Sequence, residues 1–133
     1  MINEPVRAFV AGCGYVGERI ARAEGDLGSI VSGLVRRRDR AATLKGKDLN
    51  VMGYDLDQPQ SVADLSVAGA LVYYLIPPPR HGERDVRIRA WLDGLSNEAL
   101  PLRVILISTT GVYGYCQGDL VNDSRDVDPK VPR

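Results

Sequence analysis

The chain has 133 residues, including 14 glycines and 8 prolines, and 44% of its residues are hydrophobic and 26% charged. These proportions are typical of one folded globular domain and exclude a fibrous or disordered chain. Its 17 lysines and arginines balance its 17 aspartates and glutamates, so no large positive field is available to attract nucleic acid or an anionic membrane surface.

Short apolar runs, rich in β-branched and aliphatic side chains, recur along the chain at intervals of about 20 to 25 residues. Uninterrupted runs such as residues 104–107 are typical of parallel strands that are buried on both faces. The runs predict five strands, at Arg7–Ala11, Ile30–Val35, Asn50–Tyr54, Ala70–Ile76 and Val104–Ser108.

Each gap between these runs contains a stretch with helical or turn character. Apolar residues with the spacing of one helix face predict two amphipathic helices, one from Val16, Ile20, Ala23 and Leu27, the other from Ile88, Trp91, Leu92, Leu95 and Ala99. Shorter helices are expected at Arg38–Lys45 and Pro59–Leu65, and the three prolines at 77–79 end the fourth strand. Strands that alternate with helices predict an α/β fold with a parallel sheet.

The most specific motif lies between the first predicted strand and the first predicted helix. Residues 12–17, Gly-Cys-Gly-Tyr-Val-Gly, fit the pattern G-x-G-x-x-G, which binds dinucleotides when it connects a strand to a helix. In that pattern Gly12 permits the tight turn, Gly14 lets a pyrophosphate approach the backbone, and Gly17 permits close helix packing. Tyr15 and Val16, inside the motif, are then expected to border the cofactor. The alternative is a glycine turn with a structural role alone.

The end of the second strand predicts which dinucleotide binds. A site for NAD carries a carboxylate there, about 20 residues after the glycines, which accepts hydrogen bonds from the ribose 2′-hydroxyl. Arg36 occupies this place, and its planar guanidinium suits a 2′-phosphate instead. Arg37 can add charge or stack on the adenine. These residues favour NADP over NAD, and the alternative is a solvated basic stretch that opens a helix.

With these residues in view, the chain resembles the extended and atypical short-chain dehydrogenases/reductases, the NAD-dependent epimerase/dehydratase-like group. The resemblance extends from about Val6 to about Gly118. Its second anchor is segment 106–114, Leu-Ile-Ser-Thr-Thr-Gly-Val-Tyr-Gly, which resembles the family's fifth strand and the Ser/Thr-rich turn after it. The resemblance implies a Rossmann-type, doubly wound parallel sheet in the order 3-2-1-4-5, with NADP(H) bound across the carboxyl ends of strands 1 and 4.

The resemblance also implies roles for individual residues. Thr109 matches the serine or threonine whose hydroxyl binds the reacting substrate oxygen in this family, and Ser108 is the neighbouring candidate. Asp55, followed by Leu56, matches the acid that contacts the adenine amino group in similar proteins. The fourth strand of the family ends under the cofactor's ribose, and the usual Asn-Ala-Ala is replaced there by Ile-Pro-Pro-Pro. The matching positions are Leu75, Ile76 and Pro77.

One departure from the family bears on catalysis. Its enzymes carry a Tyr-x-x-x-Lys pair after the fifth strand, in which the phenol transfers a proton, and this sequence has no such pair after Tyr113. We therefore expect an NADP(H)-binding protein that resembles oxidoreductases or nucleotide-sugar epimerases but does not turn over its unknown small-molecule substrate alone. The alternatives are a non-catalytic dinucleotide-binding module that senses redox state or binds a partner, and a fragment of a longer enzyme.

The resemblance gives two further expectations for the C-terminal part. Residues 1–117 are expected to form the NAD(P)-binding domain, and residues 118–133 a polar tail or the start of a missing C-terminal part. The later strands and the substrate-binding part of the family are expected to be absent, which leaves the apolar edge of the fifth strand open. That edge predicts a homodimer through this strand or poor solubility.

The remaining candidates have plainer explanations. His81, on the loop after the fourth strand, is expected to be solvated, with a substrate or proton-relay role as the alternative. Arg80 and Arg84 are also expected to be solvated, with contact to an anionic substrate as the alternative. Cys13 is expected to fill space, with a redox-sensing thiol as the alternative. No metal site is expected, because the cysteines and the C-terminal aspartates lack the spacing of metal ligands. Without a long apolar run or a leader at residues 1–5, the chain is predicted to be cytoplasmic and without a membrane span.

Overall fold

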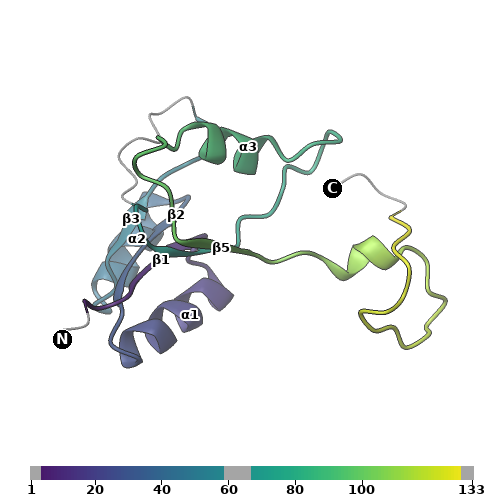
Figure 1. Cartoon of the computed structure of the whole chain (residues 1–133), viewed down its shortest axis with the longest axis horizontal. Coiled ribbons are helices and arrows are strands. Elements are labelled where there is room, and N and C mark those ends of the chain that lie inside the picture. The colour runs from purple at the N-terminus through teal and green to yellow at the C-terminus, as the bar shows by residue number, and fades with distance from the viewer. Residues whose placement is uncertain (1–3, 59–66, 130–133) are drawn as a thin grey trace.

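The computed structural model describes residues 4–58 and 67–129, and within them a parallel sheet carries helices on both faces (Figure 1). The strands are β1 (Arg7–Ala11), β2 (Ile30–Val35), β3 (Val51–Gly53), β4 (Leu71–Tyr74) and β5 (Arg103–Leu106). The helices are α1 (Tyr15–Asp26), α2 (Arg38–Lys45) and α3 (Val86–Asp93), and the 3-10 turn η2 (Thr110–Tyr113) follows. The strand order β3-β2-β1-β4-β5 confirms the predicted Rossmann-type sheet.

Three strands differ in length from the prediction for a common reason. β3 and β4 are shorter than the predicted 50–54 and 70–76, because β2 ends at Val35, opposite Gly53, and β1 ends at Ala11, opposite Tyr74. β5 begins one residue early and ends at Leu106, since its partner β4 ends there. A parallel strand stops where its neighbour stops donating and accepting hydrogen bonds.

The first helix buries a different face from the predicted one. α1 packs Gly17 and Ala21 against the sheet, whereas Val16 and Leu27 are exposed. A Cβ on Gly17 would collide with the carbonyl oxygen of Gly12, so the helix lies too close to the turn for larger side chains on that face. The predicted face through Val16 and Leu27 is therefore wrong.

The helix after β4 starts earlier and ends earlier than predicted. The Asp85 carboxylate accepts hydrogen bonds from the backbone N–H groups of Arg87 and Ile88, which starts α3 at Val86. Gly94 ends it, so the predicted continuation to Ala99 is wrong. The helix predicted at Pro59–Leu65 lies outside the described residues. None of the helices within the described ranges is long and apolar enough to cross a membrane.

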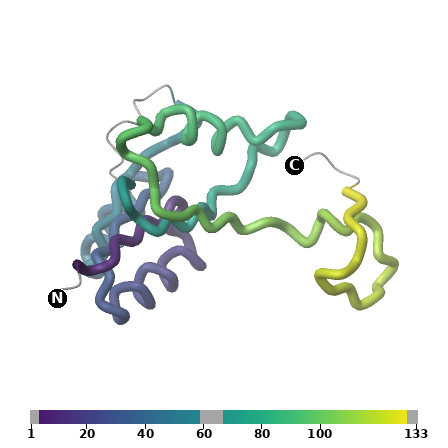
Figure 2. Tube along the Cα trace, in the orientation of Figure 1, coloured from purple at the N-terminus to yellow at the C-terminus, as the bar shows by residue number. Residues whose placement is uncertain are grey.

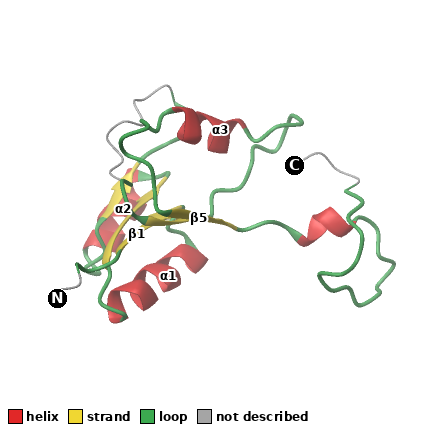
Figure 3. Cartoon of the chain, in the orientation of Figure 1, coloured by secondary structure: helices red, strands yellow, loops and turns green. Residues whose placement is uncertain are grey.

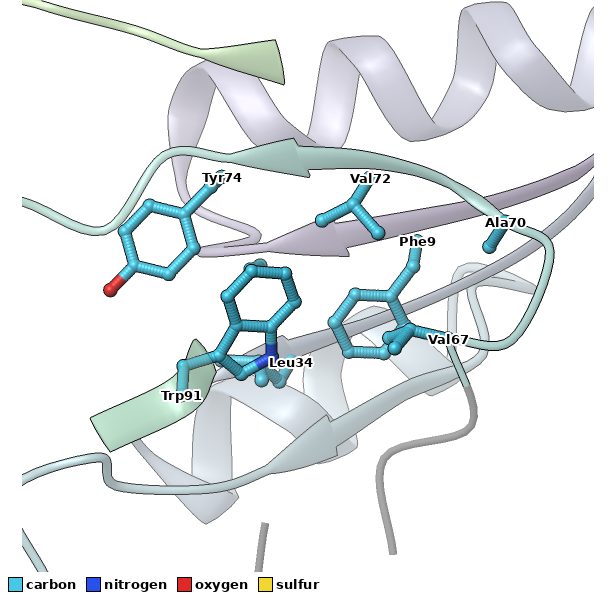
Figure 4. Packing of buried hydrophobic residues seen from close by; sticks show 8 residues of the cluster. Phe9, Leu34, Val67, Ala70, Val72, Tyr74 and Trp91 are labelled. Carbon is cyan, nitrogen blue, oxygen red and sulfur yellow. The ribbon is translucent and has the colours of Figure 1, made fainter. Parts of the chain in front are cut away.

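The core consists of two layers, one on each face of the sheet. On the α3 face, Phe9, Leu34 and Tyr74 pack against Trp91 (Figure 4), and the rings of Tyr74 and Trp91 lie 5.4 Å apart. On the face of α1 and α2, the buried residues are Val10, Cys13, Ala21, Leu44, Leu49 and Val51. The two layers cover opposite faces of β1, β2 and β4, the strands that carry the predicted cofactor site.

β5 lies at the edge of the sheet and is poorly covered. Val104 is 38% exposed, Leu106 58% and Ile107 55%, so the prediction that this run is buried on both faces is wrong for the described structure. The reason is that, among the described strands, β5 has only β4 as a neighbour. After Leu106 the chain leaves the sheet as an arm that carries η2 (Figures 2 and 3).

Candidate functional site

The glycine turn joins β1 to α1 at the carboxyl edge of the sheet. Gly12 has a φ of +100°, a backbone conformation that is strained for any residue with a side chain. A Cβ there would lie 3.1–3.2 Å from atoms of Leu75 and Ile76. The backbone N–H groups of Gly12 and Cys13 both donate to the carbonyl oxygen of Leu34, at 3.0 and 2.8 Å. These two hydrogen bonds fasten the turn to the end of β2.

Gly14, the N-cap residue of α1, has different surroundings from the other two glycines. A Cβ on Gly14 would meet no protein atom within 4 Å, and no side chain caps the start of α1. The turn therefore encloses Gly12 and Gly17 and leaves Gly14 accessible. Backbone N–H groups in the first turn of a helix favour anions, and a residue without a Cβ lets a phosphate reach them.

A cavity of about 290 Å³ lies where β2, β3 and β4 end. Its walls are mostly apolar, as a planar base requires. The structure brings together here most of the residues predicted to bind the cofactor, from four separate segments: Gly12, Gly14, Arg36, Asp55, Leu56, Leu75, Ile76 and Pro77. Arg87 and Asp57 line the same cavity.

Two arginines and two aspartates form a chain of ion pairs along this cavity. Arg36 Nε lies 3.0 Å from Asp55 Oδ2, and Arg36 Nη2 lies 3.4 Å from Asp57 Oδ2. Arg87 donates to both oxygens of Asp57, at 2.6 and 2.7 Å, and to the Pro77 carbonyl at 2.9 Å. The hydrogen bonds from Arg87 hold the pKa of Asp57 below its usual value. The Arg36 side chain is 64% exposed and that of Arg87 only 17%.

Asp57 and Arg87 are the residues that sequence reasoning missed. Asp57 lies two residues after the predicted Asp55, and no motif shows which of the two acids belongs to the site. Arg87 belongs to α3, which follows β4 in the chain. The one signal in the sequence is Asp85, a good N-cap residue two positions before Arg87. It places Arg87 in the first turn of a helix, next to the carboxyl ends of the strands.

A second cleft, of about 310 Å³, lies at the start of α2 and shares Arg36 and Val35 with the first. Arg37 and Arg40 add positive charge to it. Arg37 pairs with Asp39, which also lines this cleft. Arg36 therefore stands between an apolar cavity and a cleft of basic character.

Glu18, on α1, forms ion pairs with three basic side chains next to this cleft. Its carboxylate oxygens lie 3.2 Å from Arg22, 2.8 Å from Arg40 and 3.1 Å from Lys47. The hydrogen bond from Lys47, followed by that from Arg22, lowers the pKa of Glu18 to about 2. Glu18 thereby connects α1 to both ends of the α2 segment and holds Arg40 in place.

A third cavity, of about 550 Å³, holds the predicted substrate residues. Ser108 and Thr109 line it together with Val16. Leu75, Ile76 and Pro77 line both this cavity and the first one, so the two lie on either side of the end of β4. Thr109 Oγ1 accepts a hydrogen bond from the backbone N–H of Gly111 at 3.2 Å. Because a hydroxyl is both acceptor and donor, its proton can still be given to a ligand.

The other candidates line none of these three cavities. Tyr15 is 72% exposed and its ring lies under the guanidinium of Arg19, 3.5 Å from the ring centroid. His81 and Arg80 line a fourth cavity, of about 1020 Å³, which shares Arg36, Asp57, Pro77 and Arg87 with the first one. Cys13 is fully buried, and burial raises the pKa of its thiol. That environment suits a space-filling side chain and opposes a reactive thiolate.

Comparison with known proteins agrees on the fold. No family model matches the chain, and no curated protein matches it. A crystal structure of a protein from Burkholderia cenocepacia J2315, provisionally named an epimerase, superposes with a TM-score of 0.69 at 23% sequence identity. The match covers 96% of this chain and 46% of that one, so the chain spans about half the length of the Burkholderia structure. At this identity the likeness establishes a shared Rossmann-like fold.

Proposed function

We propose that this chain binds NADP(H) in the crevice along the carboxyl ends of β1, β2 and β4, as the cofactor-binding part of a short-chain dehydrogenase/reductase-like oxidoreductase or epimerase. The observation that carries the proposal is the lining of the first cavity. Residues assigned to a dinucleotide from the sequence, in four separate segments, lie around one apolar space beside an accessible glycine at a helix start.

Each part of the nucleotide matches one part of the site. The apolar side chains of the first cavity would hold the adenine, with Asp55 at its edge. Gly14 and the first turn of α1 would take the pyrophosphate. Arg36 and Arg37 would take the 2′-phosphate in the cleft at the start of α2. When bound, the cofactor supplies hydride transfer.

The third cavity is where we place the substrate. Thr109 would donate a hydrogen bond to the reacting oxygen, because the bond from the Gly111 N–H uses an oxygen lone pair and not the hydroxyl proton. Ser108 lines the same cavity. Residues 1–133 contain no Tyr-x-x-x-Lys pair after Tyr113. We therefore propose that residues 1–133 bind the nucleotide but do not turn over a substrate by themselves. Cys13 is a poor candidate for a redox-sensing thiol, because it is fully buried.

Calorimetric titration with NADPH and NADH tests the proposal. The wild-type chain is expected to bind NADPH more tightly, and Arg36→Ala is expected to reduce NADPH affinity to that of NADH. Gly14→Ala adds a methyl group where the phosphate would approach and is expected to weaken both nucleotides by about tenfold or more, the value of one charge-assisted hydrogen bond.

Gly25→Ala is the matched control. It makes the same change on the same helix, at a second glycine whose Cβ would meet no protein atom within 4 Å, and is expected to leave both affinities unchanged. Circular dichroism checks that all variants fold. Tighter binding of NADH, or equal affinities for Gly14→Ala and wild type, would contradict the proposal.

A further inference from the structure

The ion pairs around Arg36 bear on how the site distinguishes nucleotides, an inference that rests on the proposed function. We propose that Asp57 and Arg87 set the preference for 2′-phosphorylated nucleotides, because together they decide how strongly Arg36 is held by carboxylates instead of by a phosphate. Both act through Arg36 and are therefore positioning residues.

Arg36 is already engaged within the protein. Its guanidinium lies 3.0 Å from Asp55 and 3.4 Å from Asp57, and both acids line the first cavity. A 2′-phosphate in the cleft at the start of α2 must therefore compete with two carboxylates for the same cation. The Arg36 side chain is 64% exposed, and ion pairs at such exposure are weak enough to exchange partners.

Arg87 competes with Arg36 for the Asp57 carboxylate. It occupies both carboxylate oxygens at 2.6 and 2.7 Å, and its third hydrogen bond, to the Pro77 carbonyl at 2.9 Å, keeps it in place. The contact from Arg36 to Asp57 is the longer one, at 3.4 Å. Arg87 is thus the principal partner of Asp57, and Asp55 remains the principal partner of Arg36.

The charges of the four side chains cancel in the wild-type chain. Without the Arg87 charge, two carboxylates face Arg36, hold it more firmly and repel a phosphate. Without the Asp57 charge, the net charge of the group becomes positive and Asp55 alone holds Arg36. The two changes therefore shift the preference in opposite directions, whereas a purely structural role would weaken all nucleotides alike.

Adenosine 2′,5′-bisphosphate and 5′-AMP are the probes, because they differ only in the 2′-phosphate and need only the adenosine half of the site. The measured quantity is the ratio of their two dissociation constants by calorimetry. Asp57→Asn is expected to raise the preference for the bisphosphate about three- to tenfold and Arg87→Met to lower it by a similar factor, as expected for one partly exposed charge. The double variant is expected to return close to the wild-type ratio.

Two control variants separate this effect from net charge and from folding. Arg84→Met removes the same charge from the loop before α3, outside the cavities described above, and is expected to leave the ratio unchanged. Arg87→Lys keeps the charge beside Asp57 and is expected to stay near the wild-type ratio. If Arg87→Met does not fold, Asp57→Asn decides alone: a raised ratio supports the inference, and an unchanged or lowered ratio overturns it.

The outcomes also distinguish this inference from the proposed function. If wild type binds the bisphosphate and 5′-AMP but Asp57→Asn and Arg87→Met change both affinities equally, the role of the two residues is refuted and the nucleotide site stands. If the folded wild-type chain binds neither probe, the proposed function fails, and the inference fails with it.

Discussion

The sheet has one half that is closely packed and one half that is not. Around the glycine turn, Val10, Ala11 and Leu34 are at most 1% exposed, while on β5 Leu106 is 58% exposed. The candidate residues follow the same division, because Gly12 and Gly17 are enclosed whereas Ser108 and Thr109 stand on the segment where the chain leaves the sheet. The part of the site that we propose for the nucleotide is therefore closely packed, and the part that we propose for the substrate is exposed.

The largest test of this contrast is one truncation in each half. Trp91 is fully buried and packs against Tyr74, so Trp91→Ala is expected to cost about 3–5 kcal/mol of unfolding free energy. Leu106→Ala, in the exposed half, is expected to cost less than about 1 kcal/mol. Urea denaturation followed by far-ultraviolet circular dichroism measures both, since Trp91 is the sole tryptophan. Similar costs for the two variants would remove the contrast.

A second test is acid unfolding, which probes the ion pairs of the packed half. The pKa of Glu18 is lowered to about 2, so the stability from its three cations is fully present above its ordinary pKa of about 4.5 and disappears as the pH falls through about 2. Glu18→Gln is expected to be less stable than wild type at neutral pH and to converge with it near pH 2.

Glu98→Gln is the control for this experiment, because Glu98 is an exposed glutamate on the loop after α3. It is expected to follow the wild-type curve. Parallel unfolding curves for Glu18→Gln and wild type between neutral pH and pH 2 would show that the Glu18 ion pairs contribute nothing.

The smallest expected effect on stability concerns the open edge of β5. We propose that two copies of the chain pair through this edge, and Val104→Lys is expected to shift the dimer to monomer with little loss of stability. Val127→Lys, at an exposed valine on the arm, is the matched control and is expected to leave the dimer intact. Light scattering over a range of concentrations measures this, and a wild-type monomer with freely exchanging β5 amides would refute it.

Local signals predicted the start of the chain well. The predicted bounds of β1, β2 and α2 are confirmed. The end of β1 was predictable because the glycine turn follows it directly. The lengths of β3, β4 and β5 were not predictable residue by residue, since each depends on where a neighbouring strand ends. The buried face of α1 depends on how closely Gly17 lets the helix approach Gly12, which hydrophobic spacing does not contain.

The candidate site divides in the same way. The places of Gly14 and Arg36 follow from one motif and its spacing, and the structure puts both on one cavity. The ion pair between Arg87 and Asp57 could not be predicted, because it depends on how α3 packs over the ends of the strands. The roles of these residues toward a nucleotide stay predictions until binding is measured.

The carbonyl oxygen of Leu34 accepts two hydrogen bonds from the glycine turn and lies two residues before Arg36. The turn and the end of β2 therefore move as one body, and the span from Gly14 to the backbone of Arg36 is set before a ligand arrives. We propose that this span favours a nucleotide whose pyrophosphate and 2′-phosphate are separated by the same distance. A nucleotide phosphorylated at the 3′ position instead of the 2′ position is then expected to bind less tightly.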